Sequence, residues 1–247
     1  MPVEQTYFRK GFGLKGAIEG SLTADYHSRV VDAIRESGYA LEVGDLSFRL
    51  AGEFGFCYGV DRAVEYAYET RTKFPGKRTF LVGFTGLKNG TAGLDIPPNS
   101  VAQTEGYTTL KENTVITNFQ PHFHFRGKAM LVEAIFPDGR TQTISYVKDF
   151  NFNWMTNYIY TDDAAPVFPK GTIIHVMAVY DNTKANKSNP DPDQWVGYGD
   201  RTVDEMAHAW MNVFYLSEAE YQERVAKYGE GVTNGVKPQR PTQQQQQ

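Results

Sequence analysis

The sequence predicts an α+β chain in two parts, a small partial α/β lobe followed by an antiparallel β-sandwich or jelly roll. Helix and strand signals alternate up to about residue 83, whereas from about residue 94 short strands alternate with turn residues and helical periodicity is missing. A stretch rich in Gly, Asn and Pro, FTGLKNGTAGLDIPPNS, separates the two patterns. We therefore expect a lobe at 1–83, a junction at 84–96, a β-sandwich at 97–225 and a disordered, Gln-rich tail at 226–247.

The first part is expected to contain a βαβ unit. Apolar residues recur near helical spacing in SLTADYHSRVVDAIRESGYA, which predicts a helix that stops at Gly38. A strand-like DLSFRLA follows, and a second helix is predicted over 60–72, closed by Pro75 and Gly76. The apolar TFLVG then indicates a short buried strand. Strand, helix and strand in this order favour a right-handed unit of a parallel sheet.

The second part is expected to be all β. The predicted strands are VITNFQPHFHF, AMLVEAIF, TQTISYV, FNFNWMTNYIY and GTIIHVMAVYDN, with the PDGR turn between the second and third. Aromatic residues, 14% of the chain, gather after residue 100, as is common in β proteins. These features favour a sandwich.

Composition narrows the classes of partner and compartment. The formal charge of −4 has mixed signs and forms no basic stripe, so we expect neither a nucleic acid nor a membrane as partner. The first residues lack the apolar core of a signal peptide, and we therefore expect a cytoplasmic location. The single cysteine, Cys57, cannot form an internal disulfide and is inert, reactive or a ligand.

Two histidines stand two residues apart in FQPHFHFRGKAM. Because side chains i and i+2 share one face of a strand, His122 and His124 are expected to face the same way. A second run, RTVDEMAHAWMNVFYL, places Met206 and His208 two apart. A sandwich brings distant strands together, and two imidazoles with one thioether suit copper, especially Cu(I). The alternative is that both histidines are ordinary strand residues and that Met206 fills the core.

The residues of FQPHFHFRGKAM and RTVDEMAHAWMNVFY together resemble the C-terminal domain of copper type II, ascorbate-dependent monooxygenases. The resemblance covers roughly residues 94 to 222. It implies a mononuclear copper held by His122, His124 and Met206, a small organic substrate and an external electron donor. The family's preceding domain, which holds a second copper, has no counterpart here. The resemblance therefore implies an oxidoreductase-related copper module, incomplete as a catalyst. From the residues alone, His175 and His208 are expected to be satisfied histidines of a strand face or of the core; the alternative for His208, which shares a strand face with Met206, is a substitute ligand or a partner of one. Asp204 and Glu205 are expected to be solvated loop acids, with a hydrogen bond to a ligand ring as the alternative.

The stretch around EFGFCYGVDRAVEYAYETRTKFPGKR resembles the start of 4-hydroxy-3-methylbut-2-enyl diphosphate reductases, over about residues 7 to 83. The resemblance implies that Cys57 occupies the position of the first of three ligands to an iron–sulfur cluster. The other two cysteines are absent, so a cluster and reductase activity are not expected. The alternative for Cys57 is a free thiol in a turn before a helix. Two further interpretations stay open, a non-catalytic binding module and a fusion of two gene fragments.

Overall fold

A computed structural model describes residues 8–9, 13–51, 58–88 and 93–232, and the side chains of 8–9 and 58–63 are outside this description. It confirms an α+β chain with a β-sandwich-like part. The helices are α1 Lys15–Tyr26, α2 Arg29–Glu36, α3 Tyr58–Lys73 and α4 Glu218–Tyr228. The strands are β1 Phe8–Arg9, β2 Ala40–Val43, β3 Leu46–Arg49, β4 Thr79–Thr85, β5 Asp95–Ile96, β6 Val101–Thr109, β7 Asn113–Ile116, β8 Asn118–His122, β9 Gly127–Ile135, β10 Thr141–Val147, β11 Tyr158–Tyr160, β12 Val167–Phe168, β13 Ile173–Asp181, β14 Val196–Gly197 and β15 His208–Leu216.

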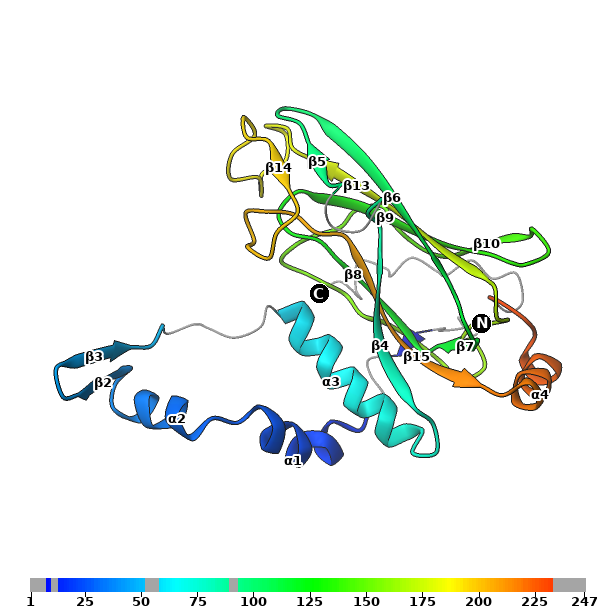
Figure 1. Ribbon diagram of the computed structural model, residues 1–247, viewed down its shortest axis with the longest axis horizontal. Coiled ribbons are helices and arrows are strands. Elements are labelled where there is room, and N and C mark those ends of the chain that lie inside the picture. Colours follow the sequence, from blue (N-terminus) through cyan, green and yellow to red (C-terminus); the bar gives the residue numbers. More distant parts are fainter. Residues whose placement is uncertain (1–7, 10–12, 52–57, 89–92, 233–247) are drawn as a thin grey trace, which may run out of the picture.

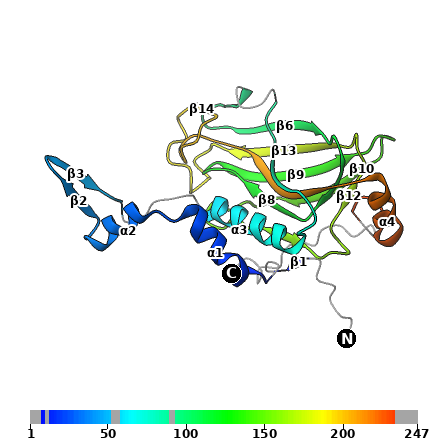
Figure 2. The same ribbon diagram turned by 60° about the horizontal axis from the view of Figure 1, so that its bottom comes forward.

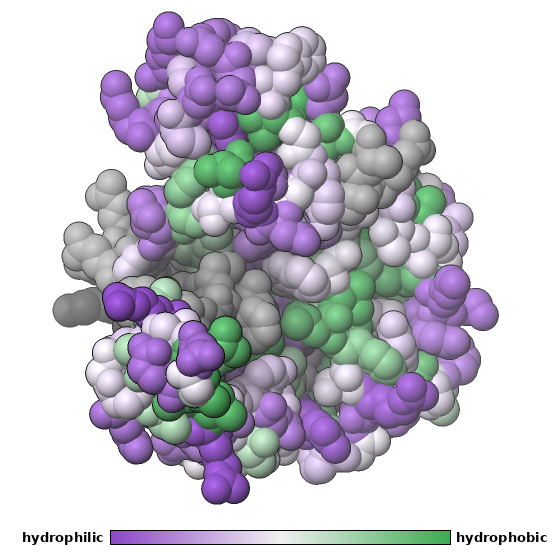
Figure 3. Space-filling model, turned by 60° about the vertical axis from the view of Figure 1, so that its left-hand side comes forward, coloured by the Kyte–Doolittle hydropathy of each residue, from purple (hydrophilic) through white to green (hydrophobic). Residues whose placement is uncertain are grey.

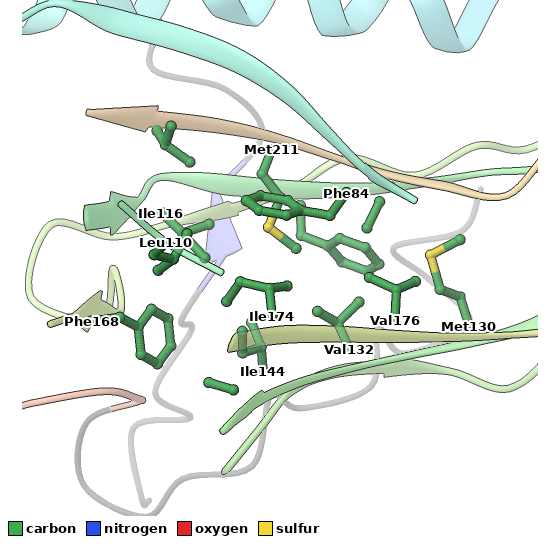
Figure 4. Close-up of a cluster of buried hydrophobic side chains, with 14 of the residues drawn as sticks. Phe84, Leu110, Ile116, Met130, Val132, Ile144, Phe168, Ile174, Val176 and Met211 are labelled. Atoms are coloured by element: carbon green, nitrogen blue, oxygen red, sulfur yellow. The ribbon is translucent and has the colours of Figure 1, made fainter. Parts of the chain in front are cut away.

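Two antiparallel sheets form the sandwich. One has seven strands, with β15 paired to β7 and β8 on one side and to β4 on the other. The second has four strands in the order β10-β9-β13-β6. Figure 4 shows apolar side chains from both sheets meeting between them, among them Met211 and Phe84 from the first sheet and Val132 and Ile174 from the second. This buried layer supplies the main hydrophobic stabilisation.

The expected parallel βαβ unit does not form among the described residues. Within the described part of the chain, β2 and β3 pair only with each other, as an antiparallel hairpin. β4, the strand after α3, instead runs antiparallel to β15 over seven residue pairs. The apolar TFLVG run predicted a buried strand but carries no information on its partner, and a free edge of the sandwich sheet supplied one. β4 also spans the boundary placed at residue 83.

Helix α3 joins the first part of the chain to the sandwich. Thr70 of α3 is fully buried, and its hydroxyl oxygen lies 3.4 Å from Asn212 Nδ2 on β15. On its other side α3 packs against α1, where Lys15 and Glu65 pair at 3.0 Å and the hydroxyl of Tyr68 donates to Asp25. Beyond α1, the segment α2-β2-β3 projects away from the sandwich in both views (Figures 1 and 2). We call α2, β2 and β3 the arm.

The predicted helix over SLTADYHSRVVDAIRESGYA is two helices, because the chain turns extended at His27 and Ser28 caps α2 by accepting from Val31 N–H. Most arm side chains are exposed, and Val30, Leu46 and Val43 are the most exposed apolar ones. Figure 3 views the molecule from the side where the arm projects and shows separate apolar patches between hydrophilic side chains.

The second part contains one helix that the strand pattern did not predict. α4 begins after Ser217, whose hydroxyl accepts from Glu220 N–H while the Glu220 carboxylate accepts from Ser217 N–H. α4 ends at Tyr228, and the bridge between Val167 and Gly231 continues the structure to 232, past the boundary placed at 225. Residues 233–247 of the expected tail lie outside the described residues.

Candidate metal centre

The candidate site begins on the outer face of the seven-stranded sheet, where His122 and His208 lie directly opposite each other on β8 and β15. A one-residue bulge sets this facing. Val213 pairs with Ile116 and Trp210 pairs with Gln120, so three steps along β15 match four along the neighbouring chain. The extra residue shifts the register by one, and it turns Phe119 and Phe123 into the core and His122 away from it.

His124 follows the end of β8 in a turn rather than in the strand, yet its ring stays near His122. The two ring centroids are 5.4 Å apart and the rings are nearly perpendicular. The Nδ1 atom of His124 lies 3.2 Å from the backbone oxygen of Asp204. A carbonyl only accepts, so Nδ1 of a neutral ring carries the proton and Nε2 keeps its lone pair. That is the form in which an imidazole binds a metal.

Glu205 connects two segments. One is the turn that carries His124, which we call the histidine turn, and the other is 204–206, which we call the DEM segment. The fully buried carboxylate of Glu205 accepts from the backbone N–H of His124 at 2.5 Å, of Arg126 at 2.8 Å and of Met206 at 3.0 Å. Burial raises the pKa of Glu205 to about 7, although the three N–H donors and the charge of Arg126 lower it. The histidine turn and the DEM segment, 80 residues apart in the sequence, are therefore in direct contact.

Arg126 carries a second set of bonds around the same turn. Its guanidinium, almost fully buried, donates to Asn182 Oδ1 and to the backbone oxygen of Val203, both at 2.8 Å, and to the Asp191 oxygen at 3.3 Å. These bonds attach the turn to the long loop before β14 and to the segment before Asp204. A buried cation needs such partners, and here they fix the backbone that presents His124.

The three imidazoles are held in their neutral form. The pKa of His122 is lowered to about 3, first by burial and then by the neighbouring rings of His124 and His208. Burial is also the largest cause of the lowered pKa values of His124 and His208. The Nδ1 atoms of His122 and His208 are buried and have no hydrogen-bond partner in the described part of the chain. A buried polar atom without a hydrogen-bond partner destabilises the folded protein unless a ligand, such as a metal ion, binds it.

Met206 lies on the same side of the sheet as His208. From Glu205 to Met211 burial alternates residue by residue, with Ala207 and Ala209 fully buried and Met206 and His208 half-buried. Because β15 pairs His208 with His122, this alternation assigns Met206 to the side that carries both imidazoles. The structure thus brings the turn that carries His124 into contact with Asp204 and Glu205, and it places His208 opposite His122. Metal binding by these side chains stays a prediction.

Within the described ranges, no three side chains of the types His, Cys, Asp and Glu are arranged to hold a metal ion. A thioether is not among those types. The neutral ring of His122, with its buried and unpartnered Nδ1, and that of His124, with its lone pair on Nε2, are nitrogen donors of the kind that copper accepts, and Met206 carries a soft thioether of the kind that Cu(I) accepts.

The two remaining histidines lie elsewhere. Cys57 is outside the described residues. His175 sits on the outer face of the four-stranded sheet, where its ring nitrogens lie 3.2 Å from Glu133 and 3.1 Å from Glu105 and its ring stacks on Tyr107. It is therefore the satisfied β-face histidine that we expected. His27 follows α1 and pairs with Asp32 at 2.5 Å.

The sequence predicted that Glu205 is a solvated loop acid or a partner of a ligand ring, and it gave Arg126 no role; the structure instead buries Glu205 against backbone N–H groups. An acidic residue beside a candidate ligand is common in loops, and the sequence signal was only the adjacency of Glu205 to Met206. Its three backbone donors come from its own neighbour and from residues 79 and 81 positions away. No local pattern encodes such a contact.

Comparison with curated proteins finds relatives of the N-terminal segment. The 4-hydroxy-3-methylbut-2-enyl diphosphate reductase of Gloeobacter violaceus is 48% identical over 77 residues, which are 31% of this chain and 18% of the reductase. The reductase of Acaryochloris marina is 44% identical over 77 residues, 19% of its length. The chain thus spans less than a fifth of the reductases it matches. This confirms the resemblance of the N-terminal segment. No family model matches the chain.

Comparison with solved structures finds structures of infectious bursal disease virus. The VP2 subviral particle of infectious bursal disease virus aligns with a TM-score of 0.28 and 10% identity over 56% of this chain and 33% of that one. The Gt strain of the same virus aligns with a TM-score of 0.21 and 12% identity over 56% of this chain and 30% of that one. These scores are too low to support a conclusion about the fold or function of this chain. Among the described helices, none combines the length and apolar character needed to cross a membrane.

Proposed function

We propose that the β-sandwich binds one copper ion through His122, His124 and Met206, as a mononuclear module related to oxidoreductases. The observation that carries the proposal is the contact between the histidine turn and the DEM segment, made by Glu205 and by the His124–Asp204 hydrogen bond. Neutral, largely buried imidazoles support it, because metal binding requires the deprotonated ring.

A bound copper ion would supply a redox-active centre able to react with oxygen. The residues of this chain bind and orient it. The Asp204 carbonyl fixes the His124 tautomer, and Glu205 holds the backbone on both sides of the site. α3 restricts access, because it packs against β8 and β15 on the face that carries His122. We place electron delivery outside the chain and assign the module no turnover of its own.

Copper stoichiometry and affinity test the site. The purified protein is titrated with Cu(I) against a competing chelator, together with His122→Ala and Met206→Ala. Two matched controls are available. His27→Ala removes an exposed histidine, and Met177→Ala removes a half-buried methionine outside the site. We expect one copper per chain, at least tenfold weaker binding in both site variants and unchanged binding in both controls. Unchanged binding in both site variants contradicts the proposal, provided that circular dichroism shows that all the proteins are folded.

The N-terminal segment favours a second proposal, that the chain joins a fragment of the diphosphate reductase to the sandwich and lacks reductase activity. The partial match, 18–19% of each reductase, supports it. So does the single cysteine of the chain, because a four-iron cluster needs several thiolates. Iron and labile sulfide analysis of anaerobically purified protein tests it. A stoichiometric four-iron cluster contradicts it, and ascorbate-dependent oxygen consumption above that of free copper contradicts the non-catalytic assignment of the sandwich.

A further inference from the structure

A cavity of about 220 Å³ opens at one side of the sandwich, away from the imidazoles. Its lining comes from β10, at the edge of the four-stranded sheet, from β8 and β11 of the other sheet, and from the loop 148–157. Its lining residues are Pro121, Val147, Asp149, Phe150, Asn151, Asn153, Trp154, Thr156 and Tyr158. Pro121 pairs with the buried Ala209 and so faces the opposite side of the sheet from His122. The cavity is therefore separate from the candidate copper site.

The loop that forms its wall is fastened to the strands. The rings of Phe150 and Phe123 meet at 5.0 Å between centroids, those of Phe152 and Phe125 meet at 4.7 Å, and Phe150 N–H donates to the Lys128 oxygen at 2.8 Å. At the tip, Asn151 accepts from Trp154 N–H through its backbone oxygen. A wall held by aromatic contacts and a hydrogen-bonded turn needs no ordering when a ligand enters.

The chemistry of the lining selects a neutral, polar ligand. No Lys, Arg or His is among the lining residues, so nothing there would hold a phosphate or a carboxylate. The only carboxylate, Asp149, is paired with Lys148 at 3.4 Å, which leaves little net charge to attract a cation. Asn151, Asn153 and Thr156 bring amide and hydroxyl groups that both donate and accept. Burial raises the pKa of Tyr158 to about 12, so its hydroxyl stays protonated.

Trp154 adds a flat apolar surface. Its side chain is 48% exposed although it lines the cavity, so a large indole ring meets solvent beside amide groups. The negative face of an indole attracts weakly positive C–H groups. A sugar ring offers such C–H groups on one face and hydroxyls around its edge. The volume, equal to roughly seven water molecules in the liquid, suits one ring rather than a chain of several.

We propose that this cavity binds a single neutral saccharide ring, with the C–H face of the sugar on Trp154 and its hydroxyls hydrogen-bonded to Asn151, Asn153 and Thr156. The proposal uses none of the residues assigned to copper and stands or falls independently of that site. It gives the sandwich a recognition role that needs no redox chemistry.

Saturation-transfer difference NMR on the full chain tests the proposal. The probes are D-glucose, D-galactose, D-mannose and N-acetyl-D-glucosamine, with choline as a cation and inorganic phosphate as an anion for comparison. Trp154→Ala removes the apolar surface, and Asn153→Ala removes an exposed amide with little risk to folding. Trp195→Ala is the matched control, since Trp195 is 63% exposed and does not line the cavity.

We expect at least one of the saccharides to bind saturably to the wild type and to Trp195→Ala. Affinity should fall at least tenfold in Trp154→Ala and measurably in Asn153→Ala, with unfolding temperatures close to that of the wild type. The proposal is overturned when no saccharide binds, when choline or phosphate is the probe that saturates, or when Trp154→Ala binds as well as Trp195→Ala.

Discussion

Replacing Glu205 with alanine tests whether its carboxylate holds the candidate site together. The change leaves the backbone N–H groups of His124 and Arg126 buried without an acceptor, and it also removes the bond from Met206 N–H. Each buried, unsatisfied donor costs about 1–3 kcal/mol, so two cost about 2–6 kcal/mol. Relief of the desolvation that raises the pKa of Glu205 offsets part of this cost. We therefore expect a loss of about 2–5 kcal/mol in the free energy of unfolding.

Urea and thermal unfolding at pH 7 measure this loss, which corresponds to a fall in unfolding temperature of about 4–20 °C for a unit of this size. Glu112→Ala, at an exposed glutamate, is the control and should stay within about 0.5 kcal/mol of the wild type. Glu205→Gln keeps one acceptor oxygen and should lose roughly half as much as Glu205→Ala. A loss below about 1 kcal/mol in Glu205→Ala, or one equal to that of Glu112→Ala, refutes the reasoning.

Three further predictions concern the pH response, the contact between β4 and β6, and the arm. The pKa of His122, about 3 when folded against 6.5 when unfolded, means that the unfolded chain binds more protons below pH 6.5, so the contribution of His122 to stability is lost as the pH falls. Urea unfolding of His122→Gln should lose about 1 kcal/mol less per pH unit between pH 6.5 and 5 than the wild type, and equal slopes would disprove the shift. In Gly106→Ala the new Cβ meets the backbone oxygen of Thr85 at 2.2 Å, so a loss of about 2–3 kcal/mol is expected, whereas Gly76→Ala, with open space around it, should stay within about 1 kcal/mol by thermal unfolding. The β2–β3 hairpin pairs with no other described strand and should exchange its amide hydrogens before β13 does in hydrogen-exchange mass spectrometry; equal protection would show that the arm is covered in solution.

The elements that sequence reasoning located are those whose signals are local. TQTISYV predicted β10 at 141–147 because the PDGR turn and strand alternation agree, and the periodic run over 60–72 predicted α3. The helix α4 had a local signal as well, since Ser217 and Glu220 have the spacing of a capping box, and it was overlooked because the surrounding pattern indicated strands.

The candidate site was only partly predictable, because its geometry depends on long-range pairing. Strand alternation predicted that His122 and His124 share a face, and their rings do lie together, although His124 is in a turn. The bulge between Ile116 and Gln120 sets the facing of His122, and only the register against β15 reveals it. The same register makes His208 the direct neighbour of His122, a relation between residues 86 positions apart that no motif states.

The N-terminal segment and the sandwich are structurally dependent, whatever chemistry each retains. β4 supplies seven residue pairs to β15, the strand that begins at His208, and Thr85 lies opposite that histidine. Without β4, the long, largely apolar β15 would present an unpaired edge, which is a site for aggregation. α3 covers the outer face of the same sheet and contacts β8. The N-terminal part of the chain therefore supplies an edge strand and a cover for the sheet that carries the imidazoles.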